Sequence, residues 1–353
     1  MYRRSSHEHP LTSLTGLYYS LKSDKLVLPE DLSSREFAFQ LYGSNKYIRH
    51  LSFRTREEVD EWIKDRKPHS AYYSSAIYEI PDAPKMNEKG WLGAELQLDI
   101  DIDHIDQCGG MLYEICNNTV LFREECITRS LEAALESVEI LRDNFGLRDI
   151  EIVFSGNRGF HVHAHDKDIL HMDNELRREI SDYLQGIGLD LKVVFPRRRG
   201  LTPFIPSREE PGWRGRLVRK ALEMYNRSDL QDVPFEKFFW SNLDNIAKSS
   251  SIPIDSQVTV DVTRLIRIPG SLNGKSGLIV EKVTEELKEY TLKDFSPFRG
   301  SLKILPVCNM EVEFGGSWHK FSRNITYRVE GALGVFLIFK SLAKLVDWGD
   351  VSV

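Results

Sequence analysis

The sequence predicts a mixed α/β (α+β) fold that is built on a largely antiparallel sheet, with flanking helices and a smaller helical insertion. Two patterns lead to this prediction. Segments typical of strands lie on both sides of a helical and basic stretch. In these segments apolar residues alternate with polar ones, or follow one another, between turn residues. Runs typical of helices have apolar residues at three- and four-residue steps. The expected strands are residues 35–41, 47–53, 95–103, 150–154, 258–268 and 278–283, and the expected helices are residues 127–145 and 173–185.

Local patterns justify these elements in order. The first two strands flank the turn residues Gly43-Ser44-Asn45, as the strands of a hairpin do. The first helix has an apolar stripe from Ile127 to Leu141, and Gly146 ends it. Asp173 begins the second helix, which opens a basic stretch of helical character. We therefore assign residues 1–167 and 251–353 to one core and residues 168–250 to the smaller insertion.

Size and composition are those of an ordinary globular protein. Its 353 residues, 41% of them hydrophobic, can bury the core of one large domain or of two. Four cysteines are too few for a secreted disulfide framework, and the first ten residues lack the apolar run of a signal peptide. The most apolar stretch, residues 331–346, carries Lys340 and Lys344 and is short for a membrane span. We expect a cytoplasmic protein without a membrane partner, in which this stretch is a buried or partner-docking helix.

Charge is distributed unevenly along the chain. A net charge of −6 and a pI near 6.0 argue against a generic nucleic-acid binder. Eight Lys and Arg residues nevertheless gather between Arg197 and Lys220, with Phe204 and Trp213 among them. Cations beside flat rings suit a single polynucleotide strand, and a solvated basic loop is the alternative.

The strand at 95–103 has one apolar and one acidic face. Leu96, Leu98, Ile100 and Ile102 alternate with polar residues, among them Asp99, Asp101 and Asp103 at every second position. Carboxylates two residues apart on a strand lie roughly 6.6 Å apart along the backbone and point the same way. Asp99 and Asp101 can therefore hold the same divalent ions, and carboxylate ligands favour Mg²⁺ or Mn²⁺ over zinc. The alternative is an exposed strand whose polar face is acidic.

Two further segments carry residues suited to phosphate. Ser155-Gly156-Asn157-Arg158-Gly159-Phe160-His161 follows an expected strand, where glycines let backbone N–H groups approach an anion and Arg158 offers a planar fork. A tight turn with an exposed arginine and a core histidine is the alternative. Later, Arg264, Arg267 and Lys275 lie near two glycine turns. Asp255 precedes them as a third carboxylate for a two-ion site, or as a turn or capping residue.

These blocks together resemble the small catalytic subunit of archaeo-eukaryotic DNA primases, and the archaeal type most closely. The resemblance covers residues 35–280, with four motifs in the family's order. They are Arg35–Phe39 with Tyr47–Arg49, Leu98–Asp101, Ser155–His161 and Asp255–Gly277. It implies template-directed synthesis of short RNA primers, or DNA primers, from nucleoside triphosphates on single-stranded DNA. It also implies a heterodimer with a larger subunit that carries an iron–sulfur domain.

The resemblance implies a role for each matching residue. Asp99, Asp101 and Asp255 would hold two Mg²⁺ or Mn²⁺ ions. The triphosphate would be bound by Ser155, Gly156, Arg158, His161, Arg267 and Lys275, with Glu36 and Arg49 lining the nucleotide site. The family's zinc knuckle would use His104, Cys108, Cys116 and Cys126, although they contain no Cys-x-x-Cys pair.

The chain departs from the family at two positions, and other functions stay open. Asn273 stands where the family usually has histidine, and Asn157 stands where it has a second basic residue. A repair or plasmid-type primase-polymerase would share these motifs. A metal-dependent nuclease or phosphatase could also use an acidic strand beside Arg and His. A non-catalytic subunit could bind single strands through the basic stretch alone.

Overall fold

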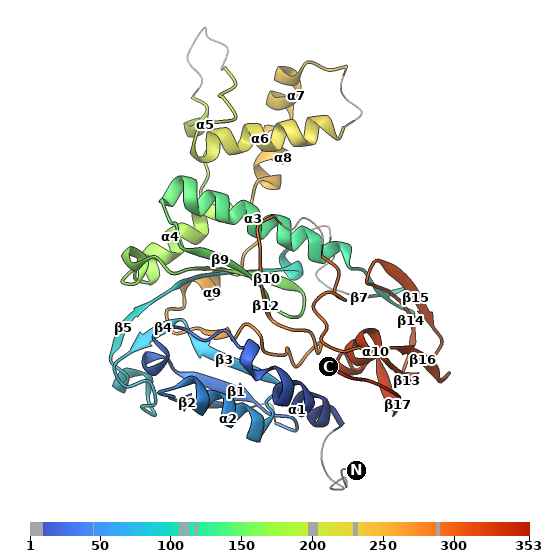
Figure 1. Ribbon diagram of the computed structural model, residues 1–353. Helices are drawn as coiled ribbons and strands as arrows, with labels where there is room; N and C mark the ends of the chain where they lie inside the picture. Colours follow the sequence, from blue (N-terminus) through green and yellow to red (C-terminus); the bar gives the residue numbers. More distant parts are fainter. Residues whose placement is uncertain are drawn as a thin grey trace.

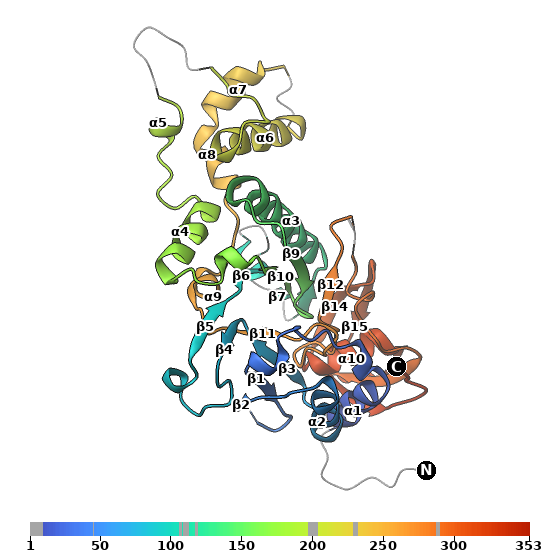
Figure 2. The ribbon, with the colours of Figure 1, turned by 60° about the vertical axis from the view of Figure 1, so that its left-hand side comes forward.

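The computed structural model describes residues 10–44, 46–105, 108, 113–116, 119–196, 204–228, 232–286 and 290–353. It has the mixed, largely antiparallel architecture that the sequence predicts. Two four-stranded sheets form the centre, a β-rich C-terminal part lies beside them, and a group of helices projects at the top of both views (Figures 1 and 2). The described strands pair antiparallel except β14 (Asn309–Phe314) with β8 (Thr119–Phe122), which pair parallel.

The first central sheet has the strand order β11-β3-β1-β2. It contains the predicted hairpin, β1 (Phe37–Gln40) and β2 (Tyr47–Leu51), which pair antiparallel. The other strands are β3 (Ser70–Ser74) and β11 (Leu265–Arg267). Helices α1 (Pro10–Lys22) and α2 (Arg56–Arg66) cover this sheet (Figure 1). Because β11 comes from late in the chain, this sheet joins the first and third motifs.

The second central sheet has the order β12-β9-β10-β6. The acidic segment forms β6 (Leu96–Asp101), beside β10 (Gly159–Ala164), β9 (Ile150–Phe154) and β12 (Glu281–Val283). Helix α3 (Glu125–Phe145) lies across this sheet, with its apolar stripe buried and Gly146 as its left-handed C-cap (Figure 1). Leu98 and Ile100 of β6 are 1% and 0% exposed, so their alternation with the aspartates leaves the acidic side chains on the opposite face.

The helical group contains two packing environments. Helix α4 (Asn174–Gln185) is capped by Asp173 and places Ile180 and Leu184 in the main core. A separate core joins α6 (Gly212–Asn226), α7 (Phe235–Ser241) and α8 (Leu243–Ser249), with α5 (Leu191–Val194) packed against it. These last four helices stand apart from the sheets in Figure 2.

The remaining elements complete the body of the protein. The C-terminal part holds β13 (Ser301–Pro306), β14, β15 (Ser317–Phe321), β16 (Tyr327–Glu330), β17 (Ala343–Asp347) and α10 (Gly331–Phe339). Helix α10 is buried nearly along its whole length, as expected for the most apolar stretch. A short sheet joins β4 (Ala76–Tyr78) to β5 (Trp91–Ala94), and β7 (Tyr113–Cys116) pairs with β8. Among the described residues, every helix is too short or too polar to cross a bilayer.

One expected strand is wrong in part. Residues 258–268 were expected to be extended, but Ser256–Val260 form a short helix, α9, and only Leu265–Arg267 form a strand. Asp255 caps α9, since its side chain accepts a hydrogen bond from the Gln257 N–H at 3.0 Å. The apolar side chains of this segment pack on α4 and β6, and that tertiary contact decides the conformation of so short a run.

Candidate active site

Two strands in register place the first acidic residues beside the glycine-rich turn. In the β6–β10 pair, Asp101 lies opposite Gly159 and Asp99 lies opposite His161. The His161 Nε2 and Asp99 Oδ1 atoms are 3.7 Å apart. A Cβ atom on Gly159 would come within 2.3 Å of the Ile100 carbonyl oxygen, so only glycine permits this close approach of the strands.

The third aspartate reaches the same place from a distant part of the sequence. The Asp255 backbone N–H donates a hydrogen bond to the Asp99 carbonyl oxygen at 2.9 Å. Burial, together with the negative charges of Asp101 and Asp255, raises the pKa of Asp99 to about 7. The Asp99 Oδ1 atom is buried and accepts no hydrogen bond from the described residues. The three carboxyl groups therefore form one electrostatic unit.

A cleft of about 450 Å³ opens over this acidic edge. Most of the residues that the resemblance assigns to nucleotide or metal line it: Asp99, Asp101, Ser155, Arg158, His161, Arg267, Lys275 and Arg49. Asn157, Arg264, Tyr47 and Tyr72 contribute further polar or aromatic surface. The arginine and lysine side chains add positive charge to the cleft, which suits a triphosphate.

The turn after β9 has the features of an anion site. Gly156 has a φ of 75°, and a Cβ there would lie 2.8 Å from the Asn273 Cβ, so the turn requires glycine. The Ser155 hydroxyl is buried and finds no partner among the described residues, which leaves it available toward the cleft. Arg158 forms ion pairs with Asp101, at 3.0 Å, and with Asp103.

Asn273 has a structural contact where the family usually has histidine. It is 1% exposed, and its Nδ2 donates to the Ser155 carbonyl oxygen at 2.8 Å. Its Oδ1 accepts from the Lys275 N–H at 2.9 Å. Asn273 therefore joins the two phosphate-type turns to each other.

Lys340 is a cation of this region that sequence reasoning missed. It follows α10, and its ammonium group donates to the Asn157 Oδ1. Burial, with the nearby charges of Arg158 and Lys275, lowers the pKa of Lys340 to about 8. No local pattern connects a lysine at the end of an apolar helix with a turn 183 residues earlier.

Glu36 and Arg49 differ in their position relative to the cleft. Arg49 lines the cleft, whereas the Glu36 carboxylate is fully buried beneath it and is not among the lining residues. The carboxylate pairs with Arg49 at 2.8 Å and with the buried Lys89 at 3.4 Å. Although burial opposes ionisation, these cations and the His50 N–H lower the pKa of Glu36. Glu36 therefore positions Arg49 from behind.

His161 is neutral at physiological pH. Burial, the neighbouring His163, and the cations Arg267 and Arg264 hold the pKa of its imidazole well below 6.5. Arg267 is itself oriented by Tyr72, whose ring centroid lies 4.9 Å from the guanidinium carbon. His161 can thus donate or accept one hydrogen bond in the cleft without carrying charge.

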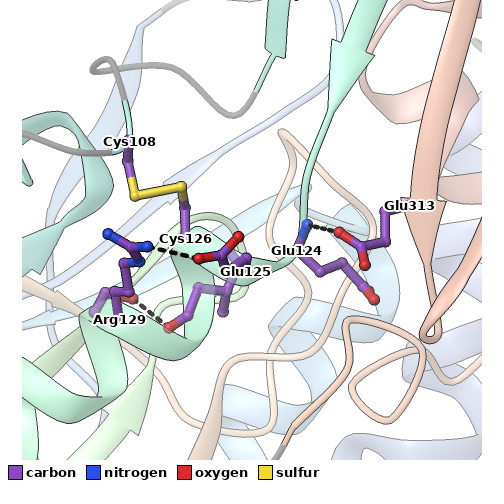
Figure 3. The surroundings of a disulfide bond; sticks show 8 residues. Cys108, Glu124, Glu125, Cys126, Arg129 and Glu313 are labelled. Atoms are coloured by element: carbon purple, nitrogen blue, oxygen red, sulfur yellow. Dashed lines mark hydrogen bonds and ion pairs between the residues drawn. A yellow bond between two sulfur atoms is a disulfide. The ribbon is translucent and has the colours of Figure 1, made fainter. Parts of the chain in front are cut away.

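The expected zinc site is corrected by the structure. Cys108 and Cys126 form a disulfide at the start of α3, and Glu125 and Arg129 pair on the adjacent turn (Figure 3). Disulfide sulfur atoms are not the thiolates that zinc requires, so these four residues do not make the site together. The side chains of the other two, His104 and Cys116, lie outside the described residues.

The basic stretch is only partly open to a polynucleotide. Residues 197–203, including three of its arginines, lie outside the described part of the chain. Arg216 is 3% exposed and binds the carbonyl oxygens of Leu184 and Ser250. Arg214 pairs with Glu210 at 2.5 Å. These two arginines therefore hold the helical group together.

The antiparallel sheets, the acidic edge and the cationic cleft define the class of a nucleotidyltransferase. Comparison with models of known families matches residues 98–285 to the DNA primase small subunit. The chain is 36% identical to the DNA primase small subunit PriS of Saccharolobus islandicus (strain L.S.2.15 / Lassen #1), over 91% of each chain. It is 39% identical to PriS of Aeropyrum pernix over 83% of this chain and 80% of the relative. PriS of Staphylothermus marinus is 33% identical over 98% and 97%, respectively.

The chain belongs to the DNA primase small-subunit family. This is the catalytic subunit of primase, and its known role is the synthesis of RNA primers. The resemblance, the fold class and the enzyme class expected from the sequence are therefore confirmed. Family membership also indicates the use of divalent metal, a partner subunit, and DNA and nucleoside triphosphates as substrates.

Proposed function

We propose that this chain joins ribonucleotides on a single-stranded DNA template, with Asp99, Asp101 and Asp255 holding two Mg²⁺ or Mn²⁺ ions. The observation that supports this most strongly is that Asp255, from a distant segment, is hydrogen-bonded through its backbone to Asp99, which lines a cationic cleft together with Asp101. Like charges that raise one another's pKa are unfavourable without a compensating cation. The buried Asp99 Oδ1 without a hydrogen-bond donor is the kind of atom that an ion would satisfy.

The donor set fits hard divalent ions. The three residues offer only carboxylate oxygens, which Mg²⁺ and Mn²⁺ prefer. When bound, such ions activate a primer 3′-hydroxyl and stabilise the charge that develops on the phosphates. The strand register fixes Asp99 and Asp101, and the Asp255 cap fixes the third carboxylate, so that positioning comes from the backbone.

The cationic residues of the cleft are proposed to hold the incoming triphosphate. Ser155 and the backbone of the neighbouring Gly156 would bind phosphate oxygens, while Arg158, Arg267 and Lys275, which line the cleft, supply positive charge. Neutral His161 would donate one hydrogen bond. Arg49, held by Glu36, would contact the nucleotide from the first sheet. That most of these residues line one cleft supports the proposal, in which Glu36 would act through Arg49.

Three expectations remain proposals about assembly. We infer that the partner is a larger subunit with an iron–sulfur domain, which would form a heterodimer with this chain. The division into a core, residues 1–167 and 251–353, and an insertion, residues 168–250, is likewise proposed; the separate packing of α6–α8 supports it. The cytoplasmic location stays a prediction from the sequence.

Primer synthesis by a carboxylate variant tests the metal assignment. Asp101→Asn is expected to abolish oligomer formation with Mn²⁺ or Mg²⁺, ribonucleotides and single-stranded DNA, because it removes a proposed ligand of the ions. Asp103→Asn is the matched control, since Asp103 lies just beyond β6 and also pairs with Arg158. The control should retain synthesis, and circular dichroism should show both variants folded.

The same assay separates the alternative functions. Primer synthesis by Asp101→Asn at the parental rate would refute the ligand assignment. Degradation of DNA without nucleotides would favour the nuclease. Product length and the preference for ribonucleotides over deoxynucleotides distinguish a replicative primase from a primase-polymerase that mainly extends primers.

A further inference from the structure

A second group of potential metal ligands lies on β9 and β10, next to the acidic edge. Glu151 of β9 pairs in register with His163 of β10, and His165 follows the end of β10 on the same face. One ligand atom from each of these residues lies within 4.8 Å of the other two. The group is separate from the three aspartates, because His161 stands between Asp99 and His163.

His163 is unusual among the buried polar residues. Its side chain is 0% exposed, yet neither ring nitrogen has a hydrogen-bond partner among the described residues. The Nδ1 atom lies 3.4 Å from the Glu151 Oε1, too far for a well-formed hydrogen bond. Leaving a buried imidazole unsatisfied is unfavourable, so we expect a group that satisfies it.

The distances from Glu151 to the two histidines match those between ligands of one ion. The His165 Nε2 lies 3.5 Å from the same Glu151 oxygen. Ligands of tetrahedral zinc, at 2.0–2.1 Å from the metal, stand about 3.4 Å apart. We propose that Glu151, His163 and His165 bind a structural Zn²⁺ ion, or another divalent ion that prefers imidazole, in addition to the ions at the aspartates.

The surroundings hold these ligands in place. The other ring nitrogen of His165, Nδ1, lies 3.2 Å from the Glu95 carboxylate, the usual outer contact of a metal-bound histidine. Glu95 is fixed in turn by Arg35 at 2.5 Å. Lys282 pairs with the second oxygen of Glu151, which leaves Oε1 directed at both histidines.

The local charge is suited to a cation. The carboxylates of Glu151 and Glu95 lie 3.5 Å and 3.2 Å from the two ring nitrogens of His165 and supply negative charge on both sides of the ring. The donors also separate the two kinds of site, since imidazole favours zinc whereas an all-carboxylate set favours Mg²⁺ or Mn²⁺.

The position of the ion gives it a structural role. It would clamp β9 to β10 at the residues next to His161, whose ring centroid lies 5.8 Å from that of His163. His163 and His165 are therefore positioning residues for the cleft and do not touch the nucleotide. This proposal does not depend on the assignment of the aspartates, and its test needs neither nucleotide nor template.

Metal analysis of the full chain tests the site. Protein dialysed against Zn²⁺ and then against metal-free buffer is expected to retain one zinc per chain at this site, as measured by mass spectrometry. Glu151→Gln and His165→Gln should each lose it. Asp101→Asn and the double variant Cys108→Ser/Cys126→Ser are the matched controls and should keep it, because they alter the acidic edge and the cysteines only.

Two further measurements keep the test decisive if a variant folds poorly. Co²⁺ bound to the wild-type protein should show ligand-field bands without the charge-transfer band of thiolate ligands. Zn²⁺ at about 100 times its dissociation constant should raise the wild-type Tm by about 4 °C. Absence of bound zinc in the wild type, or zinc that is lost with the cysteines and kept by His165→Gln, would overturn the proposal.

Discussion

Replacing Asp99 by asparagine should stabilise the metal-free protein while it abolishes primer synthesis. The carboxylate lies beside Asp101 and Asp255, with 24% of its side chain exposed. Burial and these two charges raise its pKa from 3.8 to about 7. An ionised Asp99 therefore destabilises the folded state, and the neutral amide of Asp99→Asn avoids that cost. Sites that assemble like charges for function commonly show this exchange of stability for activity.

The magnitude and its pH dependence follow from the pKa of Asp99. Below pH 4 the carboxyl is protonated in both states, so the variant gains nothing. Between pH 4 and 7 the unfolded chain releases the proton and the folded chain keeps it, so wild-type stability falls as the pH rises. Above pH 7 the full difference corresponds to about 4 kcal/mol. Because water reaches part of the side chain, we expect about half of this, about 2 kcal/mol.

Thermal unfolding in the presence of a chelator measures the effect. For 353 residues, about 2 kcal/mol corresponds to a Tm about 3 °C above wild type at pH 8. At pH 4.5 the difference should fall to about 1 °C. Asp65→Asn is the control, since that carboxylate on α2 is 76% exposed, and it should leave the Tm unchanged at both pH values. Equal Tm values for Asp99→Asn and wild type at pH 8, or a difference independent of pH, would refute the claim that the ionised Asp99 destabilises the folded state.

Two other predictions concern Lys340 and the disulfide. Lys340→Met should raise the KM for the nucleotide about tenfold with little change in kcat, because it removes a cation next to Asn157. Lys340→Arg should restore most of the affinity. The KM of the wild-type protein should rise above pH 8 as the lysine loses its proton. An unchanged KM in Lys340→Met would exclude a phosphate contact. Cys126→Ser opens a crosslink between residues 18 apart, which should cost about 3 kcal/mol and lower the Tm by about 4 °C. A reducing agent should produce the same decrease in the wild type and none in the variant; a Tm insensitive to both would contradict a stabilising disulfide.

The strands that carry the site were predictable because their patterns are local. Alternation alone places Asp99 and Asp101 on one face of β6, and the turn residues of 43–45 predict the β1–β2 hairpin. Gly146 likewise marks the end of α3. Each of these signals lies within a few residues of its element, so the element can be predicted without knowledge of tertiary contacts.

The features that sequence reasoning missed depend on contacts between distant segments. Residues 258–260 are expected to be extended, as the start of the strand at 258–268, but contacts with α4 and β6 hold Ser256–Val260 as a helix. Lys340, at the end of α10, contacts Asn157 of the cleft across 183 residues of sequence. The pairing of Cys108 with Cys126 cannot be deduced from spacing, since several pairings of the four cysteines are possible.

The charges around the three aspartates explain why Asp99 is the sensitive position. Asp101 has a cation in direct contact, because the Arg158 Nε lies 3.0 Å from its carboxylate. The nearest basic side chain to Asp99 is His161, at 3.7 Å, and burial keeps that imidazole neutral. The negative charge of Asp99 is therefore less compensated by the protein than that of Asp101. Its unsatisfied Oδ1 is an atom that a divalent ion would satisfy, so loss of Asp99 should weaken ion binding even though it strengthens the metal-free fold.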